Sequence, residues 1–243
     1  GPGRHGSHPR ARRICFYYVA KLSAEMATVL RNQTSILIRL REKLELQLEE
    51  TIPNYDRVNR LMTFGQDKNW RRNVRNHAST GMKVLEVGCG PGSFAEDLVG
   101  LDVTCLDPSE AMLKVAKKRV DGARASRGES PAAYVQALAE DIPLEDNTFD
   151  MVFCLFSFRD FQDKKKGLEE IYRVLKPGGQ LVICDAGKAN YLHGLAGRMW
   201  MSTVVQWMAR WVTKSKDHPW KGLARSYTYY GTNKYYRNLM KDV

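Results

Sequence analysis

The sequence has no apolar run that approaches the roughly 20 residues needed to span a bilayer. It also lacks a G-x-x-x-x-G-K-[ST] run, which disfavours a P-loop nucleotidase. H-E-x-x-H and paired C-x-x-C motifs are absent and the five histidines are scattered, so we expect no metal site.

The cysteines show no disulfide framework. Most of them fall inside expected strands, where a free cysteine behaves as a small apolar residue. They are Cys15, Cys89, Cys105, Cys154 and Cys184. We therefore expect a reducing compartment.

Acidic residues are few: 27 Asp and Glu stand against 38 Lys and Arg, for a net charge of +11. The excess lies towards the two ends of the chain. Such a charge is compatible with a membrane surface or RNA but does not define a fold. We expect a protein that is cytoplasmic or peripheral on a membrane surface, and the arginine-rich, acid-poor start also permits an organellar transit peptide.

Apolar residues recur at steps of three and four between residues 19 and 50, which predicts a long amphipathic helix that Pro53 ends. Residues 1–8 look like a tag remnant. We therefore assign residues 1–52 to a tag remnant and an amphipathic helix, and residues 53–243 to one domain.

From residue 82 onward, short apolar runs alternate with helical patterns. This order predicts an α/β fold with a mostly parallel sheet and helices on both faces. The expected strands are 83–87, 102–106, 133–136, 149–155 and 180–185, the helices lie near 93–99, 109–119 and 164–175, and a turn occupies 176–179.

A glycine-rich run, G-x-G-x-G, follows the first of these strands, and Asp107 ends the second. Glycines without a Cβ let the backbone approach a ligand, and an acidic residue there can accept hydrogen bonds from a ribose diol. The spacing differs from the G-x-G-x-x-G of pyrophosphate sites, which favours a nucleoside without phosphates, and S-adenosylmethionine is the obvious candidate. Spacing alone leaves a dinucleotide fold or an ordinary tight turn open.

Four stretches in this order resemble the motifs of class I S-adenosylmethionine-dependent methyltransferases: residues 84–92, 106–109, 139–143 with 146–150, and 172–179. Residues 54–65, 156–165 and 226–229 are further similar to the C-methyltransferases of ubiquinone and menaquinone biosynthesis. The resemblance covers about residues 53–240. It implies a Rossmann-like fold, S-adenosylmethionine as cofactor, and methylation of a ring carbon of a quinol precursor or a related lipid-soluble redox carrier.

The resemblance also implies a set of residues around the cofactor. Asp107 would bind the ribose, the alternative being a helix N-cap, and Glu86 would orient the glycine loop or the methionine end. The full set is Glu86, Gly88, Cys89, Gly90, Gly92, Asp107, Pro108, Met112, Ala139, Glu140, Asp141 and Phe156.

Arg159 is the main catalytic candidate, because a guanidinium can stabilise a phenolate oxygen. The alternative is a surface salt bridge to Asp160 or Asp163. We also assign Asp160 and Tyr229 to catalysis. The acceptor would contact Arg159 and a set of aromatic residues, for which packing is the alternative: Tyr55, Phe64, Tyr227 and Tyr229.

The chain departs from the family pattern at several points. Asp160 stands where the family usually has Asn, Arg60 where it has Asp, and Leu138 cannot reach an adenine amino group. The chain stops at Val243, where the family would continue into its last two strands, so either the sequence is truncated or the sheet has an exposed edge that something must cover. These departures leave two alternatives open: a soluble phenol as acceptor, or a non-catalytic lipid-binding subunit of a biosynthetic complex.

The segment 189–222 is rich in Met and Trp and is flanked by cations. A core helix is the default reading, but the composition also fits a helical lid that admits a polyprenyl tail or lies on lipid headgroups. We therefore expect a lipid-like small molecule as the substrate, and the sequence allows a peripheral membrane contact, a homodimer or a biosynthetic complex. The positive net charge is the only feature that suggests a nucleic-acid partner, so we do not expect one.

Overall fold

The computed structural model describes residues 52, 54–188, 190–214, 216, 218, 220–221, 227 and 230–242. The chain divides into two compact units, Gly1–Leu44 and Glu45–Val243, and every described residue belongs to the second. The tag remnant, the amphipathic helix 19–50 and Cys15 lie outside the described residues.

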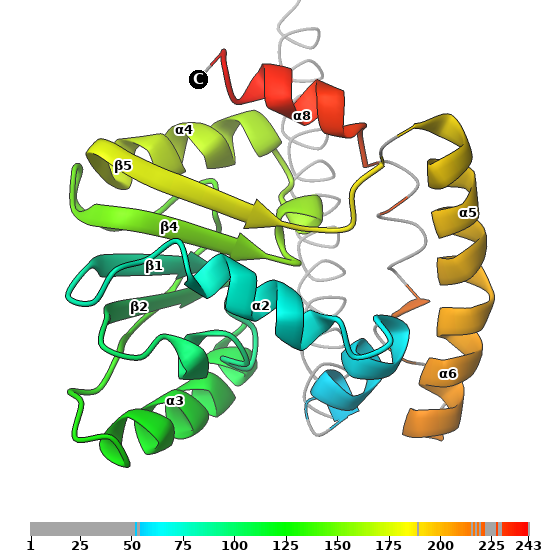
Figure 1. The fold of residues 1–243 in the computed structure, drawn as a ribbon, viewed down its shortest axis with the longest axis horizontal. Coiled ribbons are helices and arrows are strands. Elements are labelled where there is room, and N and C mark those ends of the chain that lie inside the picture. The colour runs from blue at the N-terminus through cyan, green and yellow to red at the C-terminus, as the bar shows by residue number, and fades with distance from the viewer. Residues whose placement is uncertain are drawn as a thin grey trace, which may run out of the picture. The chain divides into compact units, whose positions relative to one another are not determined.

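Five parallel strands form one sheet in the order β3-β2-β1-β4-β5 (Figure 1). Their bounds are β1 Lys83–Val87, β2 Asp102–Asp107, β3 Ala133–Gln136, β4 Phe149–Leu155 and β5 Leu175–Cys184. The chain order reverses at β1, which pairs with β2 on one side and β4 on the other. The predicted parallel α/β sheet is confirmed, and β3 and β5 are the edges among the described strands.

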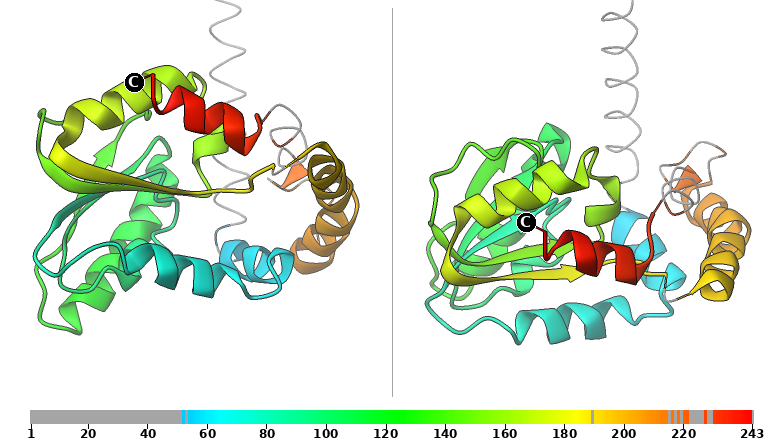
Figure 2. Two further views of the ribbon diagram at one scale, coloured as in Figure 1. Left: turned by 45° about the horizontal axis from the view of Figure 1, so that its top comes forward. Right: turned by 90° about the horizontal axis from the view of Figure 1, so that it is seen from above.

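Helices cover both faces of the sheet (Figure 2). An apolar cluster joins one face to α2 (Asp67–Arg75), the 3-10 turn η1 (Ala95–Asp97) and α3 (Glu110–Ala125). A second cluster joins the opposite face to α4 (Lys164–Val174) and α8 (Asn233–Leu239). The carboxyl ends of the strands remain available for a site.

Two helices begin at side-chain caps that the sequence provides. Ser109 accepts a hydrogen bond from the Met112 N–H at 3.3 Å and starts α3. Asp163 accepts from the Lys165 N–H at 3.0 Å and starts α4, so it is not the ion-pair partner of Arg159 that we considered.

The predicted helix 93–99 is wrong, because only the turn η1 forms there. Gly92 and Gly100 both have positive φ, at +76° and +72°, and only seven residues separate them. The chain must bend at both glycines, and the seven residues between them are too few for a regular α-helix as well as the connections to the two bends.

Strand β5 begins five residues earlier than predicted and includes the expected turn. Phe149 pairs with Leu175 and Met151 with Gln180, so the intervening residues bulge out of the ladder. Gly178, with φ of +80°, supplies the bend. A turn sequence has thus become a bulge inside a strand.

The predicted lid contains two consecutive helices, α5 (Tyr191–Ser202) and α6 (Val204–Thr213), separated by Thr203. Residues 54–62 are also helical and pack with these helices in a third apolar cluster around Val58, Val205 and Trp220. None of the helices in the described part of the chain is long and apolar enough to cross a membrane.

Candidate functional site

The glycine loop leaves β1 at the point where the strand order reverses, which is where open α/β sheets bind ligands. A Cβ at Gly88 would lie 2.3 Å from the Cβ of Ser157, so this glycine permits close contact with the turn after β4. A Cβ at Gly92 would lie 3.0 Å from the Cα of Ala116 on α3. Above Gly90, which has φ of +53°, there is open space. Gly90 is therefore the glycine of this loop best placed to face a ligand.

Asp107 fastens the glycine loop to the start of α3. One carboxylate oxygen accepts from the Gly90 N–H at 2.8 Å, and the other accepts from the Ser109 N–H at 2.9 Å. Burial raises the pKa of Asp107, and these two hydrogen bonds oppose the shift. The helix cap is Ser109, so Asp107 is not the N-cap that we considered as its alternative role.

Glu86 is 2% exposed beneath the loop, and its Oε2 atom has no hydrogen-bond partner. Burial raises its pKa to about 8, against the opposing effect of Arg71. A buried carboxyl with a vacant acceptor is costly unless a donor is supplied. The arrangement therefore suits a cationic or hydrogen-bond-donating ligand group.

Arg159 forms a closer and more buried ion pair with Asp185 than with Asp160. Arg159 Nη1 lies 2.8 Å from Asp185 Oδ1, and the Arg159 backbone N–H donates to Asp185 Oδ2 at 2.9 Å. Asp160 lies farther from the guanidinium, at 3.5 Å, and its side chain is 57% exposed. Burial lowers the pKa of Arg159, but Asp185 and Asp160 raise it above the ordinary value.

Asp185 was not among the predicted site residues. It directly follows β5, which pairs with β4, and Arg159 lies in the turn after β4. A carboxylate directly after an apolar strand could have been recognised in the sequence as a candidate. Its Oδ1 also accepts from the Ala186 N–H at 2.7 Å. Asp185 is thereby fixed, and it fixes the Arg159 guanidinium in turn.

Tyr55 reaches the same region from helical residues 54–62. Burial raises the pKa of its hydroxyl, and the positive charge of Arg159 opposes the shift. Its ring lies 6.1 Å from that of Trp220. Tyr55 is therefore close enough to Arg159 for the two side chains to interact electrostatically, and its role in binding an acceptor stays a prediction.

The other predicted acceptor residues are placed differently. Phe64 is 76% exposed and its ring lies 5.2 Å from that of Trp200 on α5. Tyr227 is 2% exposed and packs in the third apolar cluster. Tyr229 lies outside the described residues.

The remaining cofactor candidates differ in what they contact. Glu140 Oε1 accepts from the backbone N–H groups of Gln162 and Asp163, so this oxygen holds the segment before α4. Phe156 has φ of +59°, and its ring lies 6.2 Å from that of Trp70. Of the others, Cys89, Met112 and Ala139 are buried. Pro108 and Asp141 are exposed.

The structure thus gathers two kinds of group at the carboxyl edge of the sheet. One is an acidic, glycine-lined cradle formed by Glu86, Gly90 and Asp107. The other is a fixed guanidinium beside a tyrosine. Within the described residues, no group of three or more His, Cys, Asp or Glu side chains could hold a metal ion.

Comparison with known proteins gives a consistent picture. The model of the ubiE/COQ5 methyltransferase family matches residues 41–243. A demethylmenaquinone methyltransferase of Clavibacter sepedonicus is 34% identical over 147 residues, covering 59% of this chain and 58% of that protein. A ubiquinone/menaquinone biosynthesis C-methyltransferase of Geotalea daltonii is 34% identical over 159 residues, covering 62% and 66%. The chain therefore spans less than two thirds of the length of these relatives.

A solved structure supports the fold. It is an S-adenosylmethionine-dependent methyltransferase of Thermotoga maritima, described as a possible histamine N-methyltransferase, with a TM-score of 0.56 and 22% identity. The match covers 81% of this chain and 78% of that one. At this identity the likeness concerns the arrangement of strands and helices.

Proposed function

Because the chain belongs to the ubiE/COQ5 methyltransferase family, we propose that it transfers the methyl group of S-adenosylmethionine to a ring carbon of a quinol precursor. The observation that carries this proposal is the buried Arg159–Asp185 pair beside the glycine-lined cradle. The names of the two relatives, which refer to menaquinone and ubiquinone biosynthesis, support the choice of acceptor.

The cradle fits the proposed cofactor at three points. Gly90 provides space for a nucleoside against the backbone. Asp107 retains acceptor capacity on each carboxylate oxygen, which suits ribose hydroxyls. The vacant Oε2 of Glu86 suits a charged amino group. When bound, S-adenosylmethionine supplies an electrophilic methyl group on a sulfonium.

The residues around the acceptor must hold its ring carbon about 3 Å from that methyl group and raise its electron density. Arg159 can donate a hydrogen bond to the hydroxyl oxygen ortho to this carbon and stabilise the phenolate as its proton passes to water. The guanidinium is always charged, so it serves as a hydrogen-bond donor and not as a base. Asp185 positions Arg159, since its own oxygens are occupied by donors.

Bond making and breaking then balance without a protein nucleophile. S-adenosylmethionine would supply the methyl group and would keep the electron pair of its carbon–sulfur bond on sulfur, so the ring carbon would be the only nucleophile needed. The ring afterwards loses the proton from the methylated carbon to water and regains its aromatic character. Arg159 lowers the barrier by stabilising the oxyanion that drives the attack.

A lipid-like acceptor agrees with the exposed face of α5 and α6. We name the apolar side chains on this face the lid stripe: Tyr191, Leu192, Leu195, Met199, Trp207 and Trp211, which are 45–83% exposed. Met201, Val205 and Ala209 instead face the protein interior. Large apolar side chains exposed on two consecutive helices are typical of an interaction site.

The charge around the lid stripe favours an anionic bilayer as its partner. Residues 186–216 contain five Lys and Arg and no Asp or Glu. Trp and Tyr with neighbouring cations are typical of helices that lie in the headgroup layer. A peripheral contact of this kind would bring the site close to a lipid-soluble acceptor.

Calorimetric titration with S-adenosylmethionine and S-adenosylhomocysteine tests the cofactor. Incubation with labelled cofactor and a panel of prenylated quinols and soluble phenols then tests the acceptor. We expect binding of both cofactor forms and label in a quinol. Label only in soluble phenols would reassign the acceptor, and binding of lipid without cofactor would indicate a non-catalytic subunit.

A further inference from the structure

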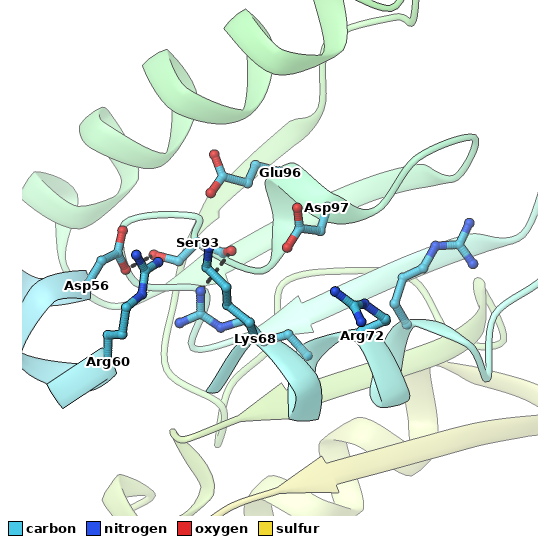
Figure 3. A pocket seen from close by; sticks show the side chains of 9 residues that line it. Asp56, Arg60, Lys68, Arg72, Ser93, Glu96 and Asp97 are labelled. Carbon is cyan, nitrogen blue, oxygen red and sulfur yellow. Dashed lines mark hydrogen bonds between the residues drawn. The ribbon is translucent and has the colours of Figure 1, made fainter. Parts of the chain in front are cut away.

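A hollow of about 470 Å³ lies between α2 and η1 (Figure 3), and neither Arg159 nor Asp185 lines it. Its lining includes Ser93, which directly follows the glycine loop, and Glu96 and Asp97 of the turn η1. Because the segment between the loop and β2 forms a single 3-10 turn, it leaves the adjoining face of α2 partly uncovered. The volume is within the range of small-molecule sites.

Four cationic side chains of α2 line this hollow: Lys68, Arg71, Arg72 and Arg75. Their spacing of three and four residues places them on one face of the helix. Like charges four residues apart repel one another, and the acid on this helix, Asp67, is buried elsewhere. Arg60 adds a fifth cation from helical residues 54–62.

Two of the three acidic residues that line the hollow lie close to Arg119, a cation outside its lining. Asp56 lies 2.7 Å from Arg119 and accepts a hydrogen bond from the Ser93 hydroxyl. Glu96 also lies near Arg119, at 3.8 Å. Asp97 remains exposed. With Arg119 included, six cations face three carboxylates, so the hollow carries excess positive charge.

Several of these cations are positioned but not neutralised. Arg71 Nη1 donates to the Ser93 carbonyl at 3.1 Å, while its Nε is buried without a partner. Arg75 donates to the carbonyls of Ala78 and Val99, each at 2.8 Å. For Arg60, Lys68 and Arg72, no ion pair is formed within the described part of the chain. Figure 3 shows Arg60 and Lys68 near Ser93, and Arg72 below Asp97.

From this arrangement we propose that the hollow binds a phosphate group, carried by a soluble phosphomonoester or by a phospholipid headgroup. A dianionic group would relieve the repulsion along α2, and guanidinium groups match phosphate oxygens in pairs. The hollow adjoins the glycine loop at Ser93, and the proposal does not depend on methyl transfer.

The test uses the full chain and two phosphate sources. Glycerol 3-phosphate is titrated by calorimetry, and phosphatidic acid vesicles are compared with phosphatidylcholine vesicles by co-sedimentation. The variant is Lys68→Gln with Arg72→Gln, since both side chains are exposed. The matched control is Lys114→Gln with Lys118→Gln. Both lysines are exposed on α3 and, like Lys68 and Arg72, they are four residues apart.

We expect saturable binding that the α2 variant weakens at least about tenfold and the α3 control leaves within about twofold. Binding of glycerol 3-phosphate that the α2 variant weakens assigns a soluble ligand. Binding of phosphatidic acid vesicles alone assigns a phospholipid if the α2 variant weakens it, because binding that this variant leaves unchanged belongs to the lid stripe and overturns the proposal. Equal weakening by both pairs, no saturable binding to either probe, or preference for single-stranded RNA over both would overturn the proposal. An unchanged melting temperature for both pairs shows that the fold is retained.

Discussion

Arg159 and Asp185 form an ion pair, 2.8 Å between nitrogen and oxygen, that joins the turn after β4 to the end of β5. The carboxylate side chain is 2% exposed and the guanidinium side chain 14%. Removing either partner should therefore destabilise the fold, because the remaining buried charge would have neither water nor a counter-ion to stabilise it.

Replacing Asp185 with Asn should lower the free energy of unfolding by about 3–5 kcal/mol. It should also lower kcat for methyl transfer more than it changes cofactor affinity, because Asp185 acts through Arg159. Asp160→Asn is the matched control for stability and should cost less than about 1 kcal/mol, since Asp160 is largely exposed. Denaturant titration and steady-state kinetics measure the two effects. Equal losses of stability in both variants would contradict this account.

Glu86 should make stability fall as the pH rises. Its pKa increases from an ordinary 4.5 to about 8 on folding, so the folded chain binds a proton that the unfolded chain releases. The stabilising contribution is complete below pH 4.5 and is lost as the pH rises towards 8, by up to about 1.4 kcal/mol per pH unit. Urea titrations between pH 5 and 8 should show this slope in the parent and a flatter one in Glu86→Gln. Glu145→Gln, an exposed substitution, should keep the parental slope.

The glycines of the loop should tolerate alanine to different degrees. Gly90→Ala should lower the free energy of unfolding by about 1–2 kcal/mol, because alanine is strained in the left-handed backbone conformation of this position. It should also weaken cofactor binding, because the new methyl group would occupy the open space in which we expect the ligand to lie. Gly88→Ala should cost more, because the methyl would overlap Ser157. Gly122→Ala on α3 is the control and should not destabilise the fold. Thermal unfolding and calorimetric titration give the order, and a more stable Gly88→Ala would refute the packing argument.

Two glycines of α5 provide a test of how Tyr227 packs. A Cβ at Gly197 would lie 2.5 Å from the Tyr227 hydroxyl, whereas one at Gly194 would meet only the Lys188 side chain at 3.4 Å. Gly194→Ala should stabilise the chain by up to about 1 kcal/mol through helix propensity. Gly197→Ala should destabilise it. If both variants melt above the parent, Tyr227 does not lie under α5.

The lid stripe should be required for binding to anionic vesicles. Trp207→Gln with Trp211→Gln should reduce co-sedimentation with vesicles by about tenfold or more, because two interfacial aromatics are lost. Stability should change little, since both side chains are over 60% exposed. Tyr172→Gln, at an exposed position on α4, serves as the control and should bind as the parent does. Retained binding in the tryptophan variant would exclude the stripe as the contact.

The sheet was largely predictable from the sequence, because its strands are short apolar runs between clear helix and turn signals. Strands β1, β3 and β4 have the predicted bounds. The helix after the glycine loop was not predictable in the same way, since its apolar residues fit a helix but two positive-φ glycines leave it too little length. The pattern of apolar residues indicates the helix propensity of this segment. The bends at Gly92 and Gly100, by contrast, limit the length of chain that is available for a helix.

The candidate site was predictable in its parts but not in its pairings. The glycine spacing and Asp107 indicated a nucleoside cradle, but the hydrogen bond from Gly90 to Asp107 depends on how two loops meet in space. Likewise, Arg159 stood out from its motif, while its pairing with Asp185 became evident only when β5 lay beside β4. The nearest acids in the sequence, Asp160 and Asp163, were the natural partners to expect, but chain proximity did not decide the closest pair.

The two backbone contacts of Asp107 also set a limit on what its side chain can recognise. A carboxylate offers about four acceptor positions, and Gly90 and Ser109 take one on each oxygen. One position per oxygen remains, which matches two neighbouring hydroxyl donors and no more. If Asp107 binds a ribose, as we propose, a nucleoside that lacks one hydroxyl would leave a desolvated acceptor unfilled. The two bonds that fix the loop would then also select for a ligand with both hydroxyls.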